Sequence, residues 1–151
     1  MNKPVLFCHD GSDGSRTALA AAVELIKPAD AVVLVVWTPA AVQLARAGSF
    51  VVAVPNEGEI DDEEAAVARQ IAEEGAAGVY KRGYNASARI AQANESVAKT
   101  IDEIAKEIDA GLVVCGQRGR SAIRSALLGS VSHALAAHTK RPLLIAPQRP
   151  S

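Results

Sequence analysis

The sequence predicts a single α/β domain in which four helices sandwich a five-stranded parallel sheet. Its 151 residues are the length of one ordinary domain. With 49% apolar and 22% charged residues, the composition is that of a folded chain with a core. Short apolar runs alternate with segments whose apolar residues recur at helical spacing. We therefore take residues 1–151 as one domain built from alternating strands and helices.

The first half of the chain predicts two strands and two helices. A short apolar run ends at Cys8, and Ser12 or Asp13 can cap the helix that follows, which Pro28 ends. The next apolar run does not alternate with polar residues, which is typical of a strand covered on both faces. The predicted order is strand 4–8, helix 14–27, strand 31–37, loop 38–60 and helix 61–77.

The second half repeats the alternation. The apolar pattern of its first strand, residues 86–93, is weak. The helix that follows is clear, because one of its faces carries Val97, Ile101, Ile104 and Ile108. Prolines at both ends of the last strand favour an edge position, where a missing backbone donor does least harm. The predicted order is strand 86–93, helix 97–108, strand 112–115, loop 116–128, helix 130–138 and strand 142–147.

Composition and charge exclude several functions. A formal charge of −1 and five scattered aromatic residues do not suit a nucleic-acid interface. The longest apolar run, near residues 31–37, is far shorter than the roughly 20 residues of a membrane span. The N-terminal residues lack the features of a signal peptide. We expect a cytoplasmic protein that binds neither nucleic acid nor membrane.

The two cysteines, Cys8 and Cys115, each lie within an apolar run. In such a position a free thiol behaves as a small buried hydrophobic group. With the scattered His9, His133 and His138, they match no metal-site spacing. We expect neither a disulfide framework, nor redox-active cysteines, nor a metal site.

The most informative stretch is the glycine motif at residues 116–131. Glycines that follow a strand allow the backbone to approach a ligand closely. The segment beginning at Gly129 opens a helix, whose free amides and dipole form an anion site, and the Ser130 hydroxyl adds a donor. Cations lie between the glycines. Without a ligand, the same pattern also fits a glycine turn after a strand, a serine that caps a helix and solvated arginines. The motif consists of Gly116, Arg118, Gly119, Arg120, Arg124, Gly129, Ser130 and Val131.

This spacing, together with the strand that ends in Asp10-Gly11-Ser12 and the terminal run 142–145, resembles the universal stress protein family. The resemblance covers essentially the whole chain and is to the ATP-binding branch of that family. It implies the strand order 3-2-1-4-5 of an adenine nucleotide α-hydrolase-like fold, and a homodimer joined through the last strand, from Pro142 to Pro147. It also implies an adenine nucleotide, ATP with Mg²⁺ or Mn²⁺, as the ligand.

The resemblance also implies roles for individual residues. Asp10 and Gly11 would lie beside the adenosine, Trp37 would flank the adenine and Gly116 would lie near the ribose. The remaining residues would line the phosphates, with Arg118 in the same loop; they are Gly119, Gly129, Ser130 and Val131.

Alternatives stay open at three positions. Asp10 could be a helix-capping acid without a ligand. Trp37 stands where the family usually has a small or aliphatic residue, so its indole could stack on adenine, narrow the pocket or serve only the core. Cys8 and His9 before the aspartate are also unusual for the family, so the pocket floor can differ.

Three functions fit these residues. The first is a regulatory or stress-response module that binds nucleotide and turns it over little. The second is a slow metal-dependent ATPase, in which Asp10 and Ser130 could hold a metal through phosphate, although no dedicated general base stands out. The third is a dimeric scaffold with an empty pocket, against which the intact glycine motif argues. We favour the first.

Overall fold

A computed structural model shows a five-stranded parallel sheet with the strand order β3-β2-β1-β4-β5. It describes residues 2–48, 53–93, 95–119 and 128–147. The fold class and strand order predicted from the sequence are confirmed. The strands are β1 (Val5–Cys8), β2 (Asp30–Trp37), β3 (Asn85–Gln92), β4 (Leu112–Gly116) and β5 (Leu143–Ala146).

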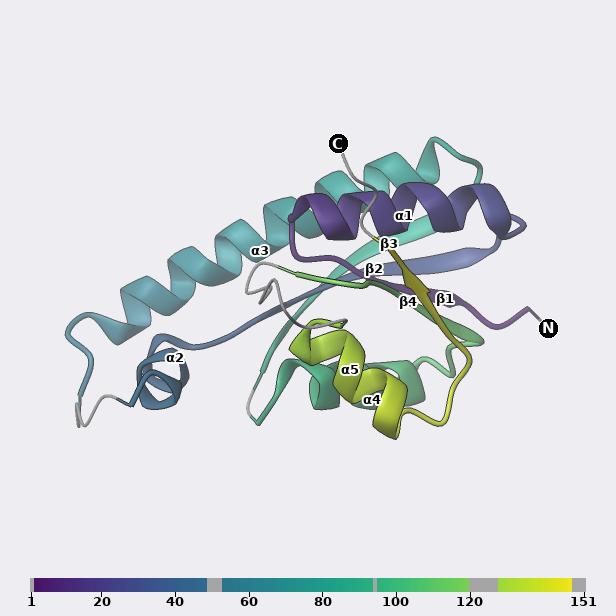
Figure 1. Cartoon of the computed structure of the whole chain (residues 1–151). Helices are drawn as coiled ribbons and strands as arrows, with labels where there is room; N and C mark the ends of the chain where they lie inside the picture. Colours follow the sequence, from purple (N-terminus) through teal and green to yellow (C-terminus); the bar gives the residue numbers. More distant parts are fainter. Residues whose placement is uncertain (1, 49–52, 94, 120–127, 148–151) are drawn as a thin grey trace.

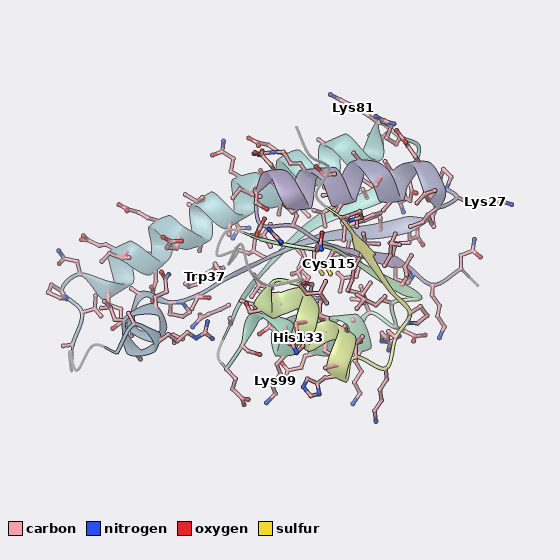
Figure 2. All side chains as sticks on the ribbon, in the orientation of Figure 1. Lys27, Trp37, Lys81, Lys99, Cys115 and His133 are labelled. Atoms are coloured by element: carbon pink, nitrogen blue, oxygen red, sulfur yellow. The ribbon has the colours of Figure 1, made fainter. Side chains whose placement is uncertain are left out.

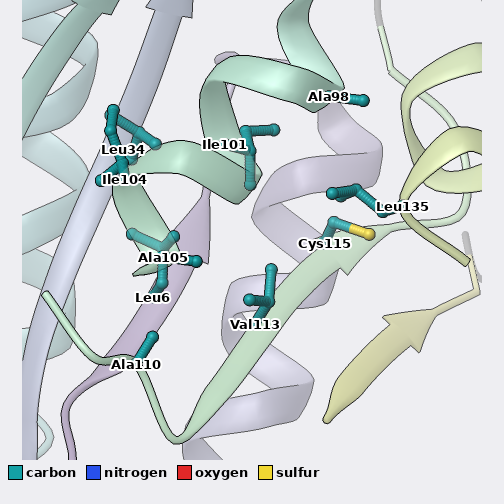
Figure 3. Packing of buried hydrophobic residues seen from close by; sticks show 10 residues of the cluster. All are labelled: Leu6, Leu34, Ala98, Ile101, Ile104, Ala105, Ala110, Val113, Cys115 and Leu135. Carbon is teal, nitrogen blue, oxygen red and sulfur yellow. The ribbon is translucent and has the colours of Figure 1, made fainter. Parts of the chain in front are cut away.

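Two layers of helices enclose the sheet (Figure 1). Helices α1 (Asp13–Leu25) and α3 (Glu57–Tyr80) cover one face, and α4 (Val97–Glu107) and α5 (Ser130–His138) cover the other. Successive strand residues point to opposite faces, so each strand supplies both cores. Leu6 and Val113 pack under α4 and α5 (Figure 3), whereas Phe7 packs under α1 and α3. Burial of each such side chain stabilises the fold by roughly 1.5–3 kcal/mol.

Serine hydroxyls start two of the helices. The Ser12 Oγ accepts a hydrogen bond from the Ser15 amide at 3.2 Å, and the Ser96 Oγ accepts one from the Lys99 amide at 3.1 Å. Helix α1 ends at Leu25, two residues before the predicted end, because the backbone is already extended at the next residue.

The prediction of a loop over 38–60 is wrong in part. Besides the four predicted helices, the described residues form another one within this range, α2 (Ala40–Arg46). Pro39 stands at the N-cap position of this helix, where its missing N–H is harmless. No residue of α2 is buried, and its seven residues are too short a run for apolar spacing to reveal it. The Asp61 carboxylate accepts a hydrogen bond from the Ala40 amide at 2.9 Å and ties α2 to α3.

Helix α3 is longer than predicted, since it runs over Glu57–Tyr80 instead of 61–77. Its buried residues are small, and Ala68, Ala72 and Ala76 let it pack close to the sheet. At Gly75 an added Cβ would lie only 2.9 Å from Val33 Cγ1. The N-terminal half of α3 extends beyond the sheet beside α2 (Figure 1).

The edges of the sheet are β3 and β5. The weakly patterned strand β3 is confirmed within one residue, and it pairs with β2 along its whole length. Its exposed position explains the weak pattern, because an edge strand needs few apolar residues. The edge position predicted for the last strand is also confirmed.

Candidate functional site

A cavity of about 430 Å³ lies at the carboxyl ends of β1, β2 and β4. Strand order reverses between β1 and β4, and this switch point is where open α/β sheets bind ligands. The loops that follow these two strands both reach the cavity, as the sequence predicted. Its volume lies within the range of small-molecule sites.

The structure places eight of the nine residues predicted for the site around this cavity. Gly11 does not line it; its φ of 79° gives the turn between β1 and α1 a left-handed residue. Arg120 and Arg124 lie outside the described residues. The eight lining residues are Asp10, Trp37, Gly116, Arg118, Gly119, Gly129, Ser130 and Val131.

Two glycines of the motif allow the two loops to touch. At Gly116 an added Cβ would lie 2.9 Å from the Gly14 carbonyl oxygen. At Gly119 it would lie 2.6 Å from the Asp10 Oδ2. Both distances are shorter than a Cβ contact tolerates. At Gly116 the neighbouring atom belongs to the backbone, so glycine is required there; at Gly119 the Asp10 carboxylate would have to move to admit a Cβ.

The start of α5 presents backbone donors to the cavity. Gly129 is the N-cap residue, and no side-chain hydrogen bond caps α5 among the described residues. The Gly129 amide and the Ser132 hydroxyl both donate to the Gln117 carbonyl, each at 2.8 Å. These bonds fix the turn, while the first amides of the helix carry the positive end of its dipole. The arrangement can bind an anion such as a phosphate group.

The loop after β1 holds the Asp10 carboxylate in place. Its Oδ1 accepts a hydrogen bond from the Ser12 amide at 2.9 Å, while Ser12 itself caps α1. The N-cap residue of α1 is therefore Ser12 and not Asp10. The carboxylate lies at the cavity wall beside Gly119, where it can accept hydrogen bonds from a ligand.

Trp37 lies at the end of β2, toward α2 and the N-terminal half of α3 (Figure 2). It packs against a small apolar cluster around Val35, Ala68 and Ala72 and also lines the cavity. The indole is half-buried, so part of it serves the core and part faces the site.

Sequence reasoning missed several residues of the cavity wall. His9 is buried, and its Nδ1 lies 2.8 Å from the Ser15 Oγ. Gln43 and Arg46 reach the cavity from the unpredicted α2, and Glu64 reaches it from α3. Arg46 also donates to the Glu95 carbonyl at 2.7 Å, which ties α2 to the start of α4. Of these residues the sequence indicated only His9, because its place after the first strand linked it to the pocket floor.

Both cysteines line the cavity as free thiols. Burial raises the pKa of Cys115 to about 11. Burial, together with the neighbouring Cys115, also raises the pKa of the Cys8 thiol well above its usual range. Within the described residues no three His, Cys, Asp or Glu side chains cluster to hold a metal ion.

The fold and the cavity define a class: open parallel α/β proteins with a ligand site at the switch point of the sheet and a helix N-terminus aimed at it. The chain belongs to the universal stress protein family, whose model matches residues 1–147. The resemblance found in the glycine motif is thus confirmed. Over 148 residues the chain is 33% identical to universal stress protein YxiE of Bacillus subtilis (strain 168), a match that covers 96% of this chain and 99% of that protein.

Solved structures share the fold. Universal stress protein UspA from Lactobacillus plantarum superposes with a TM-score of 0.78 at 22% identity, over 95% of this chain and 97% of that one. The universal stress protein from Archaeoglobus fulgidus in complex with dAMP has a TM-score of 0.62 at 19% identity, over 96% and 97% of the two chains. Among the described residues of the present chain, no helix has the length and apolar character to cross a bilayer.

Proposed function

We propose that the cavity binds an adenine nucleotide, with ATP as the ligand, and that the protein acts as a dimeric regulatory or stress-response module. The observation that carries the proposal is the uncapped N-terminus of α5, which meets the Asp10 carboxylate across one cavity at the switch point. A relative of the same fold is a complex with dAMP, which supports an adenine nucleotide as the ligand.

The nucleotide has a natural orientation in this site. Its phosphates would lie at Gly119, Gly129, Ser130 and Val131, where backbone amides and the Arg118 charge can neutralise them. The ribose would lie near Gly116, the adenosine beside Asp10, and the adenine toward Trp37. A Mg²⁺ or Mn²⁺ ion would be held by phosphate oxygens, with the Asp10 carboxylate and the Ser130 hydroxyl as the protein's oxygen donors.

The proposal includes a homodimer and a cytoplasmic location. Strand β5 is a sheet edge whose first three residues, Leu143, Leu144 and Ile145, are only half-buried, so a second copy could cover them. Sedimentation over a range of concentrations tests the dimer, and a monomer throughout would contradict it. Free thiols at Cys8 and Cys115 suit a reducing compartment, and cell fractionation tests the location.

The experiment that tests ligand binding has two stages. Freshly purified protein is denatured, and any released nucleotide is identified by chromatography. The stripped protein is then titrated by calorimetry with ATP, ADP and AMP, each with and without Mg²⁺, and with GTP as the control for the base.

We expect binding of the adenine nucleotides in preference to GTP. Because Trp37 is the single tryptophan of the chain and lines the cavity, its fluorescence should change along the same isotherm. If the protein contains no bound nucleotide and the titrations give no heat of binding, the proposal is refuted and a nucleotide-free scaffold is favoured. Metal-dependent release of phosphate during the titration would instead favour the slow ATPase.

A further inference from the structure

The two cysteines are neighbours across the sheet. Strands β1 and β4 pair in parallel with Leu6 beside Val113 and Phe7 beside Val114. The next position along both strands places Cys8 beside Cys115. The two residues are 107 positions apart in the sequence, so only the strand order brings them together.

Their side chains share one face. Leu6, Val113 and Cys115 all point toward α4 and α5 (Figure 3), and Cys8 packs against the same cluster. Adjacent strands are about 4.8 Å apart, which lies within the span of roughly 4.4–6.8 Å between the Cα atoms of a disulfide.

The cavity gives the two thiols unequal access. Both line it, but Cys8 is half-buried whereas Cys115 is only 4% exposed. Of the two residues, Cys8 therefore has the larger exposed area, and Cys115 is its neighbour on the adjacent strand.

We propose that Cys8 and Cys115 form a reversible intramolecular disulfide across β1 and β4, made by exchange with a low-molecular-weight disulfide. The Cys8 sulfur attacks one sulfur of the reagent, which breaks the reagent's S–S bond, forms a mixed disulfide and releases one thiol. The Cys115 sulfur then attacks the Cys8 sulfur of the mixed disulfide and releases the second thiol. The protein pair is oxidised by two electrons, and the reagent is reduced to two thiols that take up the two protons.

The surroundings make this exchange slow at neutral pH. Apolar side chains of α4 and α5, Ile101 and Leu135 among them, pack around the pair, and burial keeps both thiols protonated by raising their pKa values. Because the thiolate is the attacking species, the rate should rise about tenfold per pH unit below those pKa values. The other titratable side chains that line the cavity are His9, Asp10, Arg46, Glu64 and Arg118.

The test exposes the folded protein to bis(2-hydroxyethyl) disulfide, a small neutral reagent, between pH 7 and 9. Thiol titration, intact mass and peptide mapping follow the products. We expect both thiols to disappear together, a Cys8–Cys115 cross-link within single chains, about a tenfold faster reaction per pH unit, and full recovery of both thiols on reduction.

Two variants separate the steps. Cys115→Ala should stop at a stable adduct on Cys8, because the second thiol is missing. Cys8→Ala should leave Cys115 unmodified, with circular dichroism confirming that both variants fold. Two free thiols after exposure at pH 9, separate adducts on both residues, or a link only between chains would each overturn the proposal. The wild-type protein decides these outcomes even if a variant fails to fold.

Discussion

Substituting Gly129 tests whether the N-terminus of α5 is the phosphate site. The residue has φ −66° and ψ 164°, a conformation open to any amino acid, so backbone strain does not enter. An added Cβ would lie 3.4 Å from the Arg118 Cα and 3.4 Å from the Gln117 carbonyl oxygen. A single methyl group therefore fits, whereas the two further methyl groups of valine must push against this turn or enter the cavity.

We expect Gly129→Val to lose at least one hydrogen bond between a helix amide and a phosphate. Such a charge-assisted bond is worth roughly 1.5–3 kcal/mol, which corresponds to about a 10- to 150-fold weaker affinity. Gly129→Ala is the matched control. It should bind nucleotide within about threefold of the wild type and lose roughly 0.5–1 kcal/mol of folding stability, since alanine is a poorer N-cap residue than glycine.

Calorimetric titration with ATP measures the affinity of all three proteins, and circular dichroism with thermal melts shows that each is folded. A folded Gly129→Val protein that binds ATP as tightly as the wild type would refute the assignment of the phosphate site to this helix N-terminus. The assignment is refuted equally if Gly129→Ala loses as much affinity as the valine variant, because the loss would then not depend on side-chain volume.

Three further predictions concern the cavity and the fold. Trp37→Leu should weaken ATP binding by about 1–3 kcal/mol if the indole stacks on adenine; tighter binding in the same titration would show that the indole narrows the pocket. Tyr84→Phe should lower the free energy of unfolding in urea by about 1 kcal/mol, because the buried hydroxyl donates to the carbonyl of the C-cap residue of α1 at 2.7 Å; an unchanged midpoint would contradict this. Hydrogen bonds from Lys3 and Arg141 lower the pKa of Asp109 in the folded state, so the stability that this carboxylate contributes is present above its unfolded pKa and is lost as pH falls through the folded one. Asp109→Asn, which tolerates the φ of 50° there, should therefore melt below the wild type at pH 7. The two should converge only as pH falls below the lowered folded pKa of Asp109, and a gap that persists in stronger acid would refute the assignment.

The spacing of apolar residues predicted the helices and strands that pack one or both faces into the core. Phe7 and Val114 lie in dense apolar runs, so β1 and β4 were found, and the order of the sheet followed from the family resemblance. Helix α2 was missed because its residues are not buried and seven residues are too short a run for apolar spacing to reveal it. The first turn of α3 was missed because Glu57 and Gly58 carry no apolar pattern.

The candidate site could be predicted where neighbouring residues in the sequence form it, as Gly129 and Ser130 do at the start of a helix. It was not predictable where distant segments meet. The close neighbour of Gly119 is the Asp10 carboxylate, which is more than a hundred residues away in the sequence. Arg46 reaches the cavity through a helix that the sequence did not reveal. Such contacts arise only in the tertiary fold, and no residue spacing in the sequence predicts them.

The distribution of buried residues along α3 has a consequence for local unfolding. Its buried side chains begin at Ala68 and continue to Val79, while residues 57–67 are exposed or half-buried. Amide hydrogen exchange should therefore divide this one helix, with protons of its first three turns lost through low-energy fraying and those near Ala72 lost only on global opening. Glu64 and Val67, which lie in the exposed part of the helix, also line the cavity. A ligand bound in the cavity should therefore slow amide exchange in residues 57–67.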